Sequence, residues 1–303
     1  MTLERRPVID EMVGPGAALA AYFLWGISSL YWHLLPSIPP AELLSYRVLL
    51  SCVVLLAVLL ATRKLGETCR AASTRRNLVI YSCSALCIAT NWSVFMWGAI
   101  HGHVLETGVG YLIAPLINVA FGAIFFKERF TVTRYAAVAI MALALFFLTS
   151  NSGELTAWIY LTIGFSFGGY SLFRKLGPLG AIEGLAFETS LLTVVVVMAV
   201  LLGRTSLGLS VRSSPFDGFE LLSLAGIVSV VPLWLFSVAN RALRLATLGF
   251  FQYMLPTTQF ALALFFYNQL PSTRTVVCLA VIWTALALIV LESALSRSVL
   301  RPA

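Results

Sequence analysis

The feature that most constrains this chain is a series of ten apolar stretches, each close to 20 residues long. A bilayer's hydrocarbon core of about 30 Å needs about 20 helical residues to cross it. In lipid, the backbone polar groups must be satisfied within the segment itself, which favours helices. We therefore expect an all-α membrane protein with ten transmembrane helices. The expected spans are 14–34, 41–62, 77–100, 103–126, 131–149, 154–173, 180–202, 217–239, 245–268 and 272–294.

Composition excludes several other classes of protein. Hydrophobic residues make up 59% of the chain and charged residues 11%, whereas soluble domains carry about 25% charge. The net charge of +7 does not indicate nucleic acid as a partner, because the charges lie between apolar runs. Five cysteines without a C-x-x-C pair or histidines at ligand spacing predict no metal site. The sequence also lacks a P-loop and a dinucleotide motif, so no cofactor is expected.

The distribution of lysine and arginine gives an orientation. If the N-terminus is cytoplasmic, most of the 20 basic residues lie on the cytoplasmic side of the ten spans, as the positive-inside rule requires. A missed or invented helix would destroy this bias. We therefore expect both termini in the cytoplasm.

A weak internal repeat appears when the chain is shifted on itself by 141 residues. Pro115 then falls on Pro256 and Gly108 on Gly249. Five spans per repeat is an odd number, so the two repeats, 1–150 and 151–303, would enter the membrane in opposite directions. Inverted repeats of this kind are typical of secondary transporters, whose substrate site lies near the midplane. Chance matches between apolar helices remain the alternative.

Two charged residues inside the spans, Arg47 and Glu188, also coincide under this shift. Charges at the centre of a span are costly, so they usually face the protein interior or a watery pathway. Either they belong to a transport pathway, or they form a structural ion pair or reach the interface. A proton-coupled mechanism needs a buried titratable group, for which Glu188 is the candidate. By contrast, Glu106 is expected to cap a helix N-terminus, and His101 and His103 to be solvated.

Amides and aromatic rings recur at similar depths in the spans. We expect them to line or brace a central cavity that suits a small amphipathic solute, although interhelical hydrogen bonds and ordinary packing would also explain them. Pro115 and Pro256 should kink their helices, because each releases the carbonyl four residues earlier. The candidate cavity residues are Trp25, Arg47, Asn91, Trp92, Tyr111, Asn118, Glu188, Trp234, Gln252, Tyr253 and Gln259.

Residues Gly164, Ser166 and Gly168 spell G-x-S-x-G, the nucleophile motif of serine hydrolases. That motif requires a sharp strand-to-helix turn, whereas these residues fall in the middle of an expected span. The two glycines instead form G-x-x-x-G, which lets two helix backbones approach closely. We therefore expect packing here, and a protein that is not an enzyme.

Three segments carry a family resemblance: "ATNWSVFMWGAI" (89–100), "GYLIAPLINVAFGAIFFKERF" (110–130) and "TLGFFQYMLPT" (247–257). They resemble the RarD branch of the EamA-type drug/metabolite transporter superfamily, and the similarity extends over nearly the whole chain. The chain is also similar to YddG-type amino acid exporters of that superfamily. The resemblance implies ten helices in two inverted five-helix repeats and a place in the bacterial inner membrane.

Together these observations predict a secondary transporter that exports small amphipathic metabolites by alternating access. Amino acids, including aromatic ones, are the favoured substrates, because aromatic rings dominate the expected cavity wall. A multidrug exporter of chloramphenicol-type compounds is the alternative. The expected partners are a small-molecule substrate, the lipid bilayer and, if transport is coupled, protons.

Overall fold

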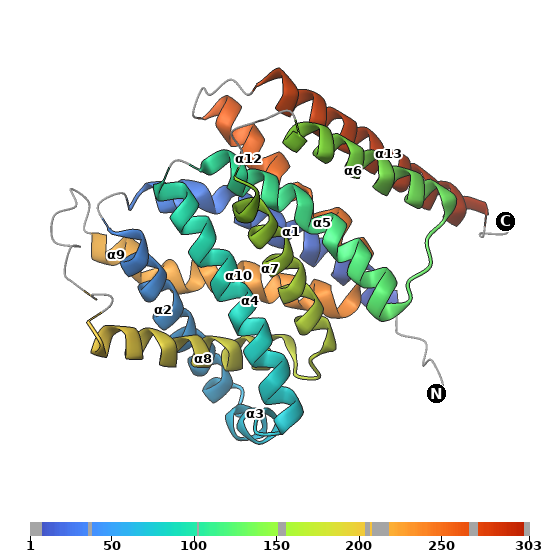
Figure 1. Ribbon diagram of the computed structural model, residues 1–303. Coiled ribbons are helices and arrows are strands. Elements are labelled where there is room, and N and C mark those ends of the chain that lie inside the picture. The colour runs from blue at the N-terminus through green and yellow to red at the C-terminus, as the bar shows by residue number, and fades with distance from the viewer. Residues whose placement is uncertain are drawn as a thin grey trace.

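The computed structural model describes residues 8–35, 38–101, 103–150, 156–203, 207, 218–266 and 272–299. Within these ranges the regular structure is entirely helical, with no strand, as expected from the sequence (Figure 1). The helices are α1 (Val8–His33), α2 (Pro40–Ala61), α3 (Leu65–Ala72), α4 (Arg75–Ile100), α5 (Val104–Phe126), α6 (Val132–Ser150), α7 (Ala157–Leu176), α8 (Ala181–Leu201), α9 (Gly218–Ser223), α10 (Ala225–Ala242), α11 (Leu245–Gln252), α12 (Met254–Phe265) and α13 (Thr273–Val299).

Seven stretches in the described part of the chain are long and apolar enough to cross a membrane. They are Val13–Trp32, Ala41–Ala61, Arg75–Phe95, Glu106–Phe126, Val132–Ser150, Ala181–Leu201 and Leu221–Ala242. The last of these continues from α9 into α10. The expected span 245–268 is divided into α11 and α12, and α13 contributes a shorter apolar run, Val276–Glu292. The ten-span inverted repeat and the cytoplasmic termini therefore remain predictions.

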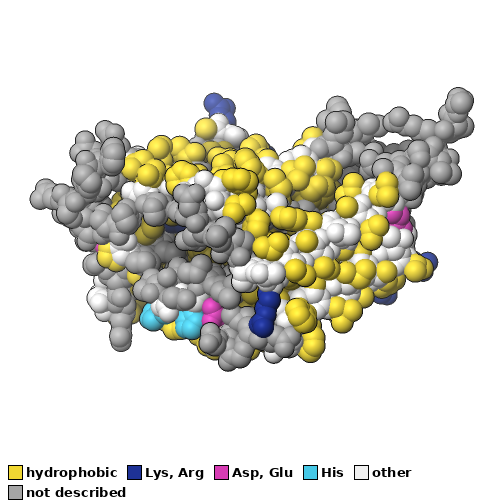
Figure 2. All heavy atoms as spheres, turned by 90° about the horizontal axis from the view of Figure 1, so that it is seen from above, with side chains coloured by type: hydrophobic (Ala, Val, Ile, Leu, Met, Phe, Trp, Pro, Cys, Tyr) yellow, Lys and Arg dark blue, Asp and Glu magenta, His cyan; other side chains and the backbone are white. Residues whose placement is uncertain are grey.

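The outer surface of the helices is apolar. Large hydrophobic side chains are widely exposed, including Val53 (62%), Leu86 (68%) and Phe146 (67%). Figure 2 shows hydrophobic side chains over much of the described part of one face, with few charges among them. Exposed apolar patches of this extent are unfavourable in water, so lipid is the natural solvent for this surface.

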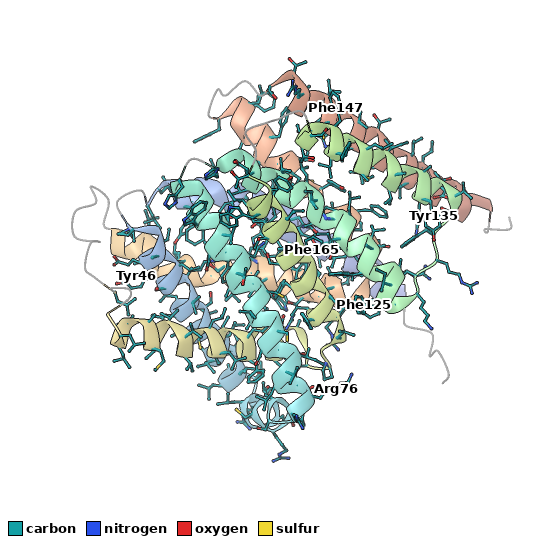
Figure 3. All side chains as sticks on the ribbon, in the orientation of Figure 1. Tyr46, Arg76, Phe125, Tyr135, Phe147 and Phe165 are labelled. Carbon is teal, nitrogen blue, oxygen red and sulfur yellow. The ribbon has the colours of Figure 1, made fainter. Side chains whose placement is uncertain are left out.

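Several connections whose sequences contain lysine or arginine lie toward one end of the bundle, which we call the basic end (Figure 1). This end holds α3 and the connections α5–α6, α7–α8 and α10–α11. Arg76, at the start of α4, lies there beside α3, whereas Phe147, near the end of α6, lies toward the opposite end (Figure 3). We call the other end, where α4 leads into α5, the opposite end.

Glycines bring α7 close to α5, as the G-x-x-x-G spacing predicts. A Cβ added at Gly164 would lie 3.1 Å from Cγ2 of Ile113, and one added at Gly168 would lie 2.5 Å from Cγ2 of Ile117. Contacts this short leave no room for a side chain. The motif therefore packs two helices together.

This packing gives a direct stability prediction. Gly168→Ala should lower the free energy of unfolding by about 1–3 kcal/mol, since the added methyl overpacks the interface with Ile117. Gly108→Ala, the same change in α5, is the matched control, because a Cβ there meets open space. The control should gain up to about 1 kcal/mol, since alanine is the better helix former. Equal melting temperatures for the two detergent-solubilised variants would contradict the prediction.

The two matched prolines behave differently. Helix α5 continues without a break through Pro115, from Val104 to Phe126. Near Pro256 the helix is interrupted at Tyr253, which separates α11 from α12. Pro115 therefore lies inside one continuous helix, whereas a single residue, Tyr253, separates two helices near Pro256, and the expected kinks at both prolines stay predictions.

Candidate functional site

Arg47 lies in α2, roughly 10 Å from its first residue at about 1.5 Å per residue. Its guanidinium carbon is 4.0 Å from the ring centroid of Trp92 on α4 and 5.3 Å from that of Trp32 on α1. Both distances fall within the cation–π range. Three helices therefore converge on one positive charge.

The guanidinium has aromatic neighbours but no carboxylate partner. Among the described residues, the ion pairs do not include Arg47. Its Nε atom is buried and makes no hydrogen bond. The side chain as a whole is half-buried. Within the part of the chain that the structure describes, Arg47 is thus a positive charge inside the bundle that has no counter-ion.

Asn91, next to Trp92 in α4, joins three helices. Its Nδ2 donates to the Ile163 carbonyl at 3.1 Å and to Ser166 Oγ at 3.2 Å. Its Oδ1 accepts from the Tyr111 hydroxyl at 2.9 Å. Ser166 in turn donates to the Ile163 carbonyl at 3.2 Å. The serine of the G-x-S-x-G motif therefore takes part in an interhelical hydrogen-bond network, and Asn91 holds Tyr111 in place.

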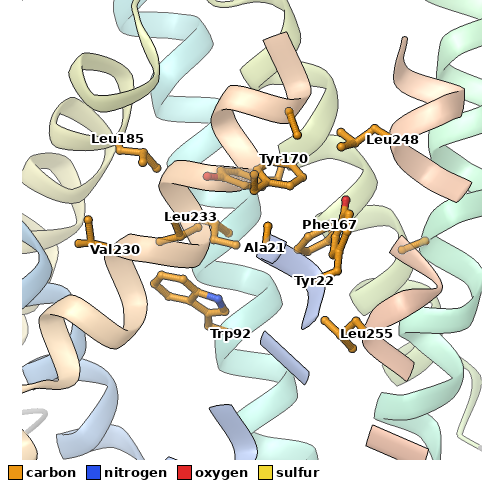
Figure 4. Close-up of a cluster of buried hydrophobic side chains, with 14 of the residues drawn as sticks. Ala21, Tyr22, Trp92, Phe167, Tyr170, Leu185, Val230, Leu233, Leu248 and Leu255 are labelled. Atoms are coloured by element: carbon orange, nitrogen blue, oxygen red, sulfur yellow. The ribbon is translucent and has the colours of Figure 1, made fainter. Parts of the chain in front are cut away.

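An aromatic cluster lies beside this network, between α1, α7 and α10. Trp25 is half-buried and has ring centroids 5.6–5.7 Å from those of Tyr22, Phe167 and Phe236. Tyr170 stacks on Phe236 at 5.4 Å. Figure 4 shows Tyr22, Phe167, Tyr170 and Trp92 within one group of buried side chains. Trp25 is one of the predicted cavity residues, whereas Phe167 and Phe236 emerge only from the structure.

Glu188 does not pair with Arg47, which corrects one of the two alternatives for these charges. Its Oε1 is 3.4 Å from Nη1 of Arg174, and both side chains are 3% exposed. Arg174 also donates to the Ala181 carbonyl at 3.1 Å. Arg174 is itself buried, although it lies in the last turn of α7. The partner of Glu188 therefore lies on the preceding helix, α7, and not on α2.

Two of the predicted amides form a separate pair. Asn118 on α5 donates from Nδ2 to Oε1 of Gln252 on α11 at 2.9 Å. Both side chains are completely buried. Asn118 Oδ1 and Gln252 Nε2 make no hydrogen bond. This pair links the two expected repeats rather than joining the group around Arg47.

Three other predicted residues lie apart from Arg47. Tyr253 is buried in a cluster built largely from α6 and α13. Gln259 is half-buried on α12. Trp234 is 41% exposed and shares the outward face of α10 with Ile227 and Val231. The structure thus groups Trp25, Arg47, Asn91, Trp92 and Tyr111 and does not bring Trp234 to them.

A small polar cluster lies at the opposite end. Glu106 is in the first turn of α5, as expected, and its Oε1 is 2.7 Å from Nδ1 of His103. The rings of His101 and His103 stack on Trp97 with centroid distances of 4.3 and 5.4 Å. The expectation that His103 is simply solvated is therefore wrong, because its ring is held between a carboxylate and an indole.

The basic end contains a pocket of about 750 Å³. Its walls come from the ends of α1, α5, α7, α8 and α10 and include Glu128, Lys175, Arg241 and Arg244. Lys175 donates to the Asn240 carbonyl at 2.6 Å. In the part of the chain that the structure describes, no group of three His, Cys, Asp or Glu could hold a metal ion.

Comparison with known proteins gives a family match, two related proteins and one solved structure. Residues 12–150 match the EamA-like transporter family. The chain is 36% identical to Protein RarD of Salmonella typhi over 276 residues, covering 91% of this chain and 94% of the relative. It is 27% identical to the chloramphenicol-sensitive protein RarD of Pseudomonas aeruginosa, covering 91% and 93%. A solved crystal structure with 16% identity and a TM-score of 0.66 covers 91% of this chain and 97% of that one, so the two share a fold.

Proposed function

Because the chain belongs to the EamA-like transporter family and is of the RarD type, we propose that it exports small amphipathic metabolites, and amino acids in particular. Members of this family are transporters, so the protein is a multi-pass membrane transporter and not an enzyme. The proposed mechanism is alternating access, in which a central site opens to each side of the membrane in turn. The proposed location is the bacterial inner membrane, with both termini in the cytoplasm.

The single observation that supports an amino acid substrate is Arg47. A guanidinium without a counter-ion inside a helix bundle is costly and is typical of a functional site. Its planar donors match a carboxylate well. Trp32 and Trp92 flank it at 5.3 and 4.0 Å, which provides apolar surface for a side chain. A solute with a carboxylate next to a ring or aliphatic group fits this arrangement.

Proton coupling at Glu188 is not part of this proposal. Its carboxylate already has a buried cationic partner, Arg174, at 3.4 Å. An ion pair of this kind is broken only at considerable cost. We assign Glu188 a structural role between α7 and α8.

The test is a flux measurement with the purified full-length protein in liposomes. Labelled phenylalanine, leucine and threonine should exchange faster than in protein-free liposomes. Phenethylamine, which is phenylalanine without its carboxylate, is the matched control solute and should not be accelerated. Equal rates for all amino acids in loaded and empty liposomes would exclude this substrate class.

A multidrug exporter is the second candidate. It is favoured by the ring-rich cluster around Trp25 and by the likeness to a relative whose name refers to chloramphenicol. Chloramphenicol carries no carboxylate, so this function would not need Arg47. Overexpression should then change drug susceptibility equally for the parent protein and for Arg47→Gln, whereas amino acid export should depend on Arg47.

A further inference from the structure

Helix α11 is attached to α5 at its first turn through Glu128, which follows the end of α5. Glu128 Oε1 accepts the backbone N–H of Leu245 at 2.8 Å, and Oε2 accepts that of Ala246 at 3.1 Å. These are unsatisfied donors at a helix N-terminus, where negative charge is stabilised. The carboxylate is therefore a cap supplied by another helix.

The backbone conformation just after α5 places this carboxylate at the start of α11. Lys127 adopts a left-handed conformation with φ of 51°, which turns the chain back on itself. The Glu128 N–H then donates to the Gly122 carbonyl at 3.1 Å. A Cβ added at Gly122 would lie 2.7 Å from Glu128 Oε2 and 3.2 Å from the Ala246 nitrogen. Glycine at position 122 thus provides the space that the carboxylate occupies.

Two further contacts hold α11 along the rest of its length. A Cβ added at Gly249 would lie 2.8 Å from the Pro115 carbonyl oxygen, so the two backbones touch there. At the last residue of α11, Gln252 accepts from Asn118 at 2.9 Å. All three attachments come from α5 or the residue just beyond it, so the eight residues of α11 are fixed to one helix at both ends and in the middle.

The attachment changes immediately after Gln252. The helix is interrupted at Tyr253, and Pro256 has no N–H with which to bond the Gln252 carbonyl. Beyond the interruption, α12 packs mainly against α1, whereas α11 packs mainly against α5. A Cβ added at Gly26 of α1 would lie 2.5 Å from Cβ of Thr258, and Trp283 of α13 donates to Thr257 Oγ1 at 2.9 Å.

We propose that α5 and α11 form one rigid unit across the two expected repeats, that Glu128 is the positioning residue that holds it together, and that residues 253–256 are the hinge. The hinge part rests on the proposed alternating access, because it assigns the bending of that motion to the break between α11 and α12. The rigid unit itself depends only on the contacts of Glu128, Gly249 and Asn118.

The first experiment tests the unit without any solute. A nitroxide label is placed on α11 at Thr247, which is half-buried, after the native cysteines are replaced. Glu128→Gln and Gly122→Ala should each increase the label's mobility, and the double variant should not exceed the larger single effect, since both break one contact. Glu67→Gln and Gly66→Ala on α3 are matched controls, because both residues are exposed and a Cβ at Gly66 meets open space. Unchanged label mobility in the single variants, or additive effects in the double variant, would contradict the proposed rigid unit of α5 and α11.

The second experiment tests the hinge by flux of whichever solute the protein moves. Pro256→Ala restores the missing N–H and should slow exchange roughly tenfold, the effect of about one strong hydrogen bond on a conformational equilibrium. Pro115→Ala is the control, because it also restores an N–H but in α5, where the helix has no break. Equal exchange rates for Pro256→Ala and Pro115→Ala would contradict the proposed hinge at residues 253–256. They would not affect the result of the label experiment. A failure of amino acid flux would affect only the proposed substrate.

Discussion

Replacing Arg47 with glutamine is expected to weaken phenylalanine binding about 10- to 100-fold. Hydrogen bonds to charged groups contribute about 1.5–3 kcal/mol each, and 1.4 kcal/mol corresponds to a factor of ten. The affinity of Arg47→Lys should fall between those of the parent and of Arg47→Gln, because lysine keeps the charge but lacks the planar pair of donors. The measurement is a dissociation constant for the purified protein in detergent or nanodiscs.

Thermal stability separates this effect from misfolding. Arg47 has no carboxylate partner among the described residues, so removing its charge deprives no counter-ion of its partner. The loss of the cation–π contacts with Trp32 and Trp92 offsets part of the gain from removing a buried charge, so we expect Arg47→Gln to unfold close to the parent's temperature while binding poorly. Arg70→Gln on α3 is the matched control, since Arg70 is exposed, and it should alter neither property. Parent-like affinity in Arg47→Gln would refute the role of this residue in solute recognition.

Glu188→Gln is expected to destabilise the protein by about 3–5 kcal/mol, because it leaves the buried charge of Arg174 uncompensated. Removing both charges with Arg174→Met and Glu188→Leu should recover most of the loss, since apolar groups of similar volume replace a buried pair well. The free energies of unfolding of the parent and of the two variants can be compared by denaturant titration in mixed micelles.

The protein contains a natural control for this prediction. Lys64 and Glu183 form an ion pair at 3.0 Å, with side chains 55% and 19% exposed. Exposed pairs contribute only about 0–1 kcal/mol, so Glu183→Gln should have a small effect. If Glu183→Gln and Glu188→Gln cost the same, burial does not distinguish the two pairs and the structural role of Glu188 is wrong.

The packing role of the G-x-x-x-G motif could be predicted because it depends on local sequence. Gly164 and Gly168 lie one turn apart on any helix, so their small size necessarily makes a groove. Which helix fills that groove was not predictable. The structure shows that Ile113 and Ile117 of α5 do so, and that Ser166 between the glycines bonds to Asn91.

The partners of the charged residues were harder to predict. The 141-residue shift matched Arg47 with Glu188, but the structure pairs Glu188 with Arg174 on the neighbouring helix. Depth along a helix follows from sequence position, whereas the direction of a side chain around the helix depends on packing. Glu128 was missed for the same reason: it follows α5 in sequence, and only the turn at Lys127 brings it to the start of α11.

The sequence by itself determined that this chain crosses a membrane as a set of helices, because runs of about 20 apolar residues leave the backbone no other stable form in lipid. It also identified the residues that are costly in such a setting, among them Arg47, Asn91 and Glu188. Only the tertiary structure decided which of them are satisfied by neighbours, and that Arg47 has no carboxylate partner among the described residues. That outcome depends on contacts between helices far apart in the chain, and such contacts leave no periodic signal in the sequence.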